Sequence, residues 1–160
     1  MTNGIYLNLR FNPVMPTPMS AFIQACIKSP KQGLRFIGNY PELSEHWLAL
    51  WGNHPAFPAW TERSFIVSND GIATLQLASA SDVSSVNTLK SFIEWVLPYT
   101  VSTGLVGIYI TKPWIEYPKL LTVRHGKLQC QYCSRWADLS NVTPDLAMIE
   151  KIKQLPQLIR

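Results

Sequence analysis

Apolar and polar residues alternate in several short segments of the chain, which is the pattern of β-strands with one buried face. In the first segment, residues 4–11, every second residue from Ile5 onward is apolar. Asn69, Asp70 and Gly71 separate two such segments and form a turn, because Asn and Gly tolerate the backbone dihedrals of tight turns. His125 and Gly126 separate another two. The pattern predicts strands at residues 4–11, 33–37, 61–68, 72–78, 105–111, 119–124 and 127–136.

Apolar residues recur at helical spacing in four other segments. Thr17 followed by Pro18 supplies a helix cap and a first-turn proline, and Ser29 with Pro30 ends that helix. Pro98 marks the end of the longest helix, which starts at Ser81 or Ser84. The pattern predicts helices at residues 17–29, 39–52, 81–97 and 143–155, and a loop with two prolines at residues 53–60.

The expected order of elements is β-α-β-α-β-β-α-β-β-β-α. Clustered hairpins with helices between them indicate an α+β fold, in which about four helices pack on a largely antiparallel sheet. A chain of 160 residues without an internal repeat or linker fits one domain over residues 1–160.

Charged residues make up 15% of the chain, against roughly 25% in typical domains. The net charge of +4 permits an anionic partner but does not require one. Residues 1–10 lack the features of a signal peptide, and the uncharged segment 95–111 is too short and interrupted to cross a membrane. Three cysteines leave one unpaired, which is typical of a reducing compartment. We therefore expect a cytoplasmic protein with no membrane segment.

Four residues of the chain could in principle form a zinc site. Cys130 and Cys133 form a C-x-x-C pair, and Cys26 and His125 would complete a set of four zinc ligands. A zinc knuckle needs both thiolates of the pair on a tight turn. Here the pair falls inside a predicted strand, where residues three apart point to opposite faces. We expect packed thiols and no metal.

Catalysis is also disfavoured. His46, His54 and His125 have no adjacent nucleophile motif. The string Gly107-Ile108-Tyr109 resembles the opening of GIY-YIG nucleases, but the second half of that motif is missing about ten residues on. The eight glycines form no phosphate-binding motif. We expect no cofactor and no enzymatic activity.

Aromatic residues are concentrated in residues 47–60, which contain Trp47, Trp51, Phe57 and Trp60. Helical spacing of the first two is typical of core packing, whereas aromatic residues in loops are available for protein contacts. The segment between Pro113 and Pro118 also contains aromatic residues that are available for protein contacts. Aromatic residues of these two segments and the acidic residues near them are the candidate partner-binding residues. They are Glu42, Glu45, Trp51, Phe57, Trp60, Glu62, Trp114, Glu116 and Tyr117.

Lys119, Arg124 and Lys127 supply an alternative, a basic sheet surface interleaved with aromatic residues that binds nucleic acid. Strand alternation would spread these charges over both faces of the sheet, which disfavours this alternative. No recognised nucleic-acid motif accompanies them.

The run Gly104-Leu-Val-Gly-Ile-Tyr-Ile-Thr-Lys-Pro-Trp114, followed by Leu120-Leu-Thr-Val-Arg-His-Gly-Lys-Leu128, resembles bacterial immunity proteins in style, as do the chain's size and order of elements. Immunity proteins are the antidotes of contact-dependent and other secreted polymorphic toxins. The resemblance covers the C-terminal third and holds no diagnostic motif, so it assigns no residue a role. It implies a cognate protein toxin as the partner, and neutralisation by covering the toxin's active site without chemistry.

Overall fold

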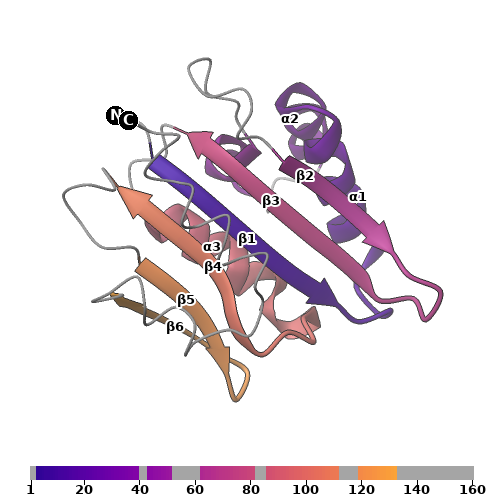
Figure 1. The fold of residues 1–160 in the computed structure, drawn as a ribbon. Helices are drawn as coiled ribbons and strands as arrows, with labels where there is room; N and C mark the ends of the chain where they lie inside the picture. The colour runs from indigo at the N-terminus through magenta and orange to yellow at the C-terminus, as the bar shows by residue number, and fades with distance from the viewer. Residues whose placement is uncertain (1–2, 40–42, 52–61, 82–85, 112–118, 133–160) are drawn as a thin grey trace.

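A six-stranded antiparallel sheet forms the centre of the computed structural model, which describes residues 3–39, 43–51, 62–81, 86–111 and 119–132 (Figure 1). The strands lie in the order β2-β3-β1-β4-β5-β6, so β1 is central and β2 and β6 are the edges. The predicted α+β fold with a largely antiparallel sheet is confirmed. The strands are β1 (Asn3–Phe11), β2 (Glu62–Val67), β3 (Ala73–Ser81), β4 (Gly104–Thr111), β5 (Lys119–Arg124) and β6 (Lys127–Tyr132).

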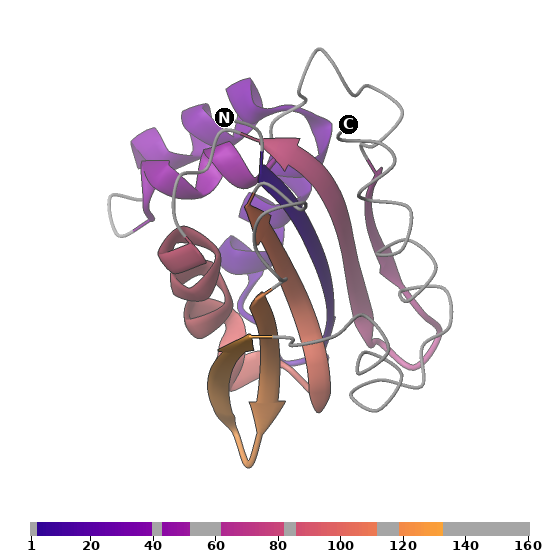
Figure 2. The same cartoon turned by 60° about the vertical axis from the view of Figure 1, so that its left-hand side comes forward.

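The described helices lie on one side of this sheet, behind it in Figure 1 and to its left in Figure 2. None of them is long and apolar enough to span a membrane. They are α1 (Thr17–Lys28), α2 (Pro30–Asn39), the 3-10 helix η1 (Glu45–Trp51), α3 (Val86–Val96) and the short 3-10 helix η3 (Leu97–Tyr99).

The predicted strand at residues 33–37 is wrong, because this segment belongs to α2. Ser29 and Pro30 end α1, as predicted, but they also start the next helix. The Ser29 hydroxyl accepts a hydrogen bond from the Gln32 amide at 3.2 Å, and Pro30 stands at the first helical position. The apolar residues Phe36 and Ile37 then face α1 and the core rather than the two sides of a strand.

Other predicted boundaries are only partly covered by the described residues. The helix predicted at 39–52 is the shorter 3-10 helix η1, and the described part of β6 ends at Tyr132. The predicted loop at 53–60, residues 133–136 and the predicted helix at 143–155 lie outside the described residues.

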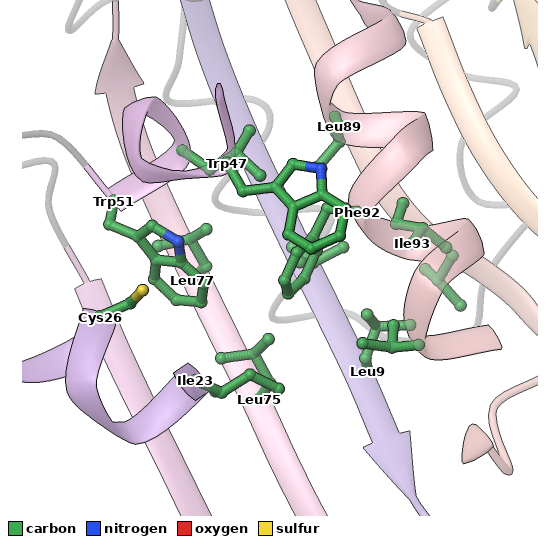
Figure 3. Close-up of a cluster of buried hydrophobic side chains, with 14 of the residues drawn as sticks. Leu9, Ile23, Cys26, Trp47, Trp51, Leu75, Leu77, Leu89, Phe92 and Ile93 are labelled. Atoms are coloured by element: carbon green, nitrogen blue, oxygen red, sulfur yellow. The ribbon is translucent and has the colours of Figure 1, made fainter. Parts of the chain in front are cut away.

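The core forms between the helices and one face of the sheet. Ile5, Leu7, Leu9 and Phe11 of β1 are fully buried there, because alternate residues of a strand share a face. Aromatic rings fill the space above them, as Figure 3 shows. The Trp47 ring lies 4.7 Å from that of Trp95 and packs edge-on against Phe92 at 5.8 Å, and its Nε1 donates to Ser91 Oγ at 3.1 Å.

The second face of the sheet, which is turned away from α1, α2 and α3, is buried over most of β4 and β5, including Leu105 and Thr122, and is exposed at individual residues near one end. Tyr6, Ile108 and Leu120 are buried at the other end of this face. We call the end with the exposed residues the hairpin end, because the β2–β3 and β5–β6 turns both lie there (Figure 1). The side chains of Arg10 and Ile66 are exposed at the hairpin end of the second face.

Two glycines of α2 give a matched test of the packing between α1 and α2. A Cβ on Gly33 would stand 2.7 Å from Cys26 Sγ and 2.8 Å from Leu48 Cδ2, whereas one on Gly38 would meet nothing within 4 Å. Gly33→Ala is expected to lower the free energy of unfolding by about 1–3 kcal/mol, because the core must shift. Gly38→Ala is expected to raise it by about 0.5–1 kcal/mol, since alanine favours helix. Chemical denaturation measures both, and equal effects would contradict this packing.

Candidate contact surface

Trp51 is fully buried, so the prediction that it belongs to a contact surface is wrong. Its ring packs edge-on against Phe92 at 5.7 Å and lies between Cys26 and Leu77 in Figure 3. Trp47 and Trp51 are four residues apart on the 3-10 helix η1, and both point toward the core. Their spacing therefore reflects core packing, the interpretation that the sequence also allowed.

The other predicted contact residues are not brought together by the described structure. Glu45 begins η1 and Glu62 begins β2, where it pairs with Ala78. The structure describes the backbone of these two residues but not their side chains. The remaining predicted contact residues lie outside the described residues: Glu42, Phe57, Trp60, Trp114, Glu116 and Tyr117.

The thiols of Cys26 and Cys130 are in opposite environments. Cys26 is buried beneath α2, and this burial raises the pKa of its thiol to about 12, although the Arg63 guanidinium acts in the opposite direction. Cys130 is exposed on the edge strand β6. Cys133 lies outside the described residues. Cys26 is therefore a packed thiol and Cys130 is the accessible one.

The imidazoles lie on separate elements. His46 is exposed on η1, and His125 is exposed at the β5–β6 turn, where its φ of 52° is in the left-handed region. His54 lies outside the described residues. Within the described ranges, no three His, Cys, Asp or Glu side chains form a group suited to holding a metal ion.

The predicted basic residues divide between the two faces of the sheet. Lys119 lies on the helix side, with its Nζ 5.9 Å from the Tyr109 ring centre and 5.5 Å from that of Tyr132. Arg124 and Lys127 lie on the second face, since Val123 and Leu128, next to them in sequence, turn toward the core. The exposed ring of Tyr132 and the exposed cations Arg124 and Lys127 are therefore on different sides of the sheet.

Exposed apolar side chains gather at the hairpin end. Val67 on the helix side and Ile66 on the second face retain 58% and 65% of their surface, and both belong to the edge strand β2. Val14, at 75% exposed, follows Pro13, which packs against Gly71 of the β2–β3 turn. Val101 is 43% exposed, and its amide donates to the Arg10 carbonyl at 2.8 Å. Four of the six large apolar residues that are exposed in the described part of the chain are therefore at this end.

The sequence contained one signal for this surface. In a half-buried strand apolar residues alternate with polar ones, whereas Phe65, Ile66 and Val67 are apolar in succession. On an edge strand such a run leaves apolar side chains on both faces, with the last two exposed.

The β2–β3 turn that carries part of this surface is held by several hydrogen bonds. The Ser68 amide donates to the Ile72 carbonyl at 2.9 Å, and the Gly71 amide donates to the Ser68 carbonyl at 3.0 Å. The Asp70 carboxylate accepts from the Ser68 hydroxyl and from the Ile72 amide. These two hydrogen bonds lower the pKa of Asp70, the Ser68 hydroxyl contributing most.

Comparison with known proteins gives no relative: the chain matches no protein-family model, no curated protein and no solved structure.

Alkylation distinguishes the two described thiols. At about pH 8 iodoacetamide is expected to modify Cys130 in the native protein, whereas Cys26 should react only after denaturation, because it is buried and keeps its proton. Peptide-resolved mass spectrometry measures both rates. Similar rates in the native protein would mean that α2 does not cover Cys26.

The Asp70 carboxylate tests the β2–β3 turn. Ser68→Ala is expected to raise the pKa of Asp70 toward its ordinary 3.8, because the largest stabiliser of the charged form is removed. In the native protein the charged carboxylate stabilises the turn at pH values above its ordinary pKa. This stabilisation is lost as the pH falls through the lowered pKa of the native protein. Carboxyl NMR titration reads the pKa directly. Ser20→Ala on α1 is the control, and an unchanged Asp70 titration in Ser68→Ala would refute the hydrogen bond.

Proposed function

We propose that this chain acts by binding another protein, and that it is an immunity protein that neutralises a cognate bacterial toxin by covering the toxin's active site. The observation that carries the proposal is the exposed apolar surface at the hairpin end, where Val14, Ile66, Val67 and Val101 gather. Clustered exposed apolar residues mark interaction sites more often than scattered ones do.

The amount of surface left to bury supports a useful binding energy. Burying a whole Val or Ile side chain contributes about 1.5–3 kcal/mol, so burying the exposed half of Ile66 or Val67 contributes roughly 1 kcal/mol each. The turn beneath them is already ordered by its hydrogen bonds, so binding need not order it.

The proposed mechanism needs no reacting group of this chain. The Cys26 thiol is protonated and buried, and the two described imidazoles lie on η1 and on the β5–β6 turn. No described pair of them supplies a nucleophile beside a base. The proposal places the antidote in the cytoplasm, where a toxin that has entered the cell would act.

The proposal is tested with the toxin encoded beside the gene. The purified chain is expected to form a one-to-one complex with that toxin, and its expression is expected to protect cells from it. Calorimetry measures the complex, and survival of toxin-expressing cells measures protection. If the chain neither binds the toxin nor protects cells, the proposal is wrong.

The hairpin end is tested by a double variant. Ile66→Ser with Val67→Ser is expected to raise the Kd for the toxin at least about tenfold, because roughly 2 kcal/mol of apolar burial is lost. Leu34→Ser, which changes a 51% exposed residue on α2, is the matched control and should leave the Kd unchanged. The thermal midpoint checks that each variant folds. If only the control variant loses affinity, the toxin binds on the helix side and not at the hairpin end.

A further inference from the structure

We infer that the hairpin end of the second face docks an acidic protein surface through Arg10, Arg124 and Lys127, with Ile66 and Val101 beside them. This inference rests on the proposed function and specifies which chemistry the toxin presents. All five side chains are exposed.

The strand registers place the cations on one face and at one end. Arg10 lies between Leu9 and Phe11, which point into the core, so Arg10 points away from it. Arg124 and Lys127 also point away from the core and close the β5–β6 hairpin. Only β4 separates β1 from β5, so these strands are about 10 Å apart at the usual strand spacing. One partner surface of ordinary size covers that distance.

Arg124 and Lys127 form an unfavourable pair. They are direct partners across the β5–β6 hairpin, where side chains begin about 5 Å apart and like charges repel. Arg10 stands near Asp70 of the β2–β3 turn, whose pKa its charge helps to lower, whereas Arg124 and Lys127 repel each other. An acidic side chain of a partner would relieve this repulsion, and local conflicts of this kind are expected at functional sites.

Arg10 stands on a backbone that is held in place. Its amide donates to Ser102 Oγ at 2.8 Å, and its carbonyl accepts from Thr100 Oγ1 and from the Val101 amide, both at 2.8 Å. Its strand partner Thr74 is also the partner of Ile66, so Ile66, Thr74 and Arg10 form one row across the second face. Arg10 therefore lies at a fixed spacing from the exposed Ile66, with Thr74 between them.

Carboxylates fit this surface better than nucleic-acid phosphates do. Guanidinium groups bind carboxylates with two parallel hydrogen bonds, and apolar neighbours strengthen such pairs by excluding water. Binding of single-stranded nucleic acid also uses exposed aromatic rings for stacking. Among the residues that the structure describes, the strongly exposed ring of Tyr132 lies on the helix side, and Tyr6 on the second face is buried. The geometry therefore favours an acidic protein surface.

The test compares charge reversals on the two sides of the sheet. Arg10→Glu and Arg124→Glu are each expected to raise the Kd for the adjacent-gene toxin at least about tenfold in low salt, because each leaves a partner carboxylate unpaired or repelled. Arg35→Glu on α2 makes the same charge change on the helix side and should leave the Kd unchanged. Added salt should weaken the wild-type complex and reduce the difference between variants.

Stability separates a docking role from a structural one. Arg124→Glu replaces the like-charged pair by an opposite-charged pair with Lys127, so its thermal midpoint should be equal to or above that of the wild type while its affinity falls. A lower midpoint that tracks the loss of affinity would indicate a structural role and overturn the inference.

The remaining outcomes are also decisive. If the toxin binds Arg10→Glu and Arg124→Glu as tightly as Arg35→Glu, the inference is wrong and the proposed function stands. If the wild type does not bind the toxin, the proposed function fails and the inference fails with it. If these charge reversals abolish binding of a single-stranded DNA oligonucleotide but leave toxin affinity unchanged, the surface binds nucleic acid and the inference is wrong.

Discussion

The register of the central strand β1 determines the rest of the molecule. Its alternate residues Ile5, Leu7, Leu9 and Phe11 enter the core, and its pairing with β3 and β4 transmits that choice of face to the other strands. A slip of one residue would turn these side chains outward and turn Arg10 inward. The apolar burial between the sheet and the helix layer would then be lost. The position of Arg10 on the second face therefore follows from the packing of the core on the first.

The same constraint explains why the residues that stabilise the fold and the residues proposed to bind a partner are different. Trp51, which the sequence analysis named as a candidate contact residue, instead fills the space between η1, α3 and the sheet together with Trp47. The exposed groups instead stand on the edge strand β2, at the end of β1, in the segments next to β1 and β4, and at the β5–β6 hairpin, where burial contributes little to folding. A surface that contributes little to folding is free to carry repelling cations such as Arg124 and Lys127.

Local patterns predicted most of the described fold. Alternation located β1 and the strands from β4 to β6, the Asn69-Asp70-Gly71 turn located the β2–β3 hairpin, and Pro98 marked the end of the helical region of α3. Residues 33–37 were misread because Ser29 and Pro30 both end one helix and begin the next.

The proposed contact surface could not be predicted from the sequence in the same way, because it depends on which residues become neighbours after folding. Composition singled out the tryptophans, but the exposure of an aromatic residue depends on what packs against it, and Trp51 is covered by Phe92. Arg10, Ile66 and Val101 are distant in sequence and meet only through the strand registers and the backbone bond from Val101 to Arg10. The apolar succession in β2 was the one local signal.

Hydrogen–deuterium exchange of the complex with the adjacent-gene toxin tests the central claim most directly. The account predicts that the toxin slows exchange at the β2–β3 turn and in residues 12–14 and 101–103, at the hairpin end, and leaves α2 unchanged. Protection of α2 and η1 with an unchanged hairpin end would contradict it.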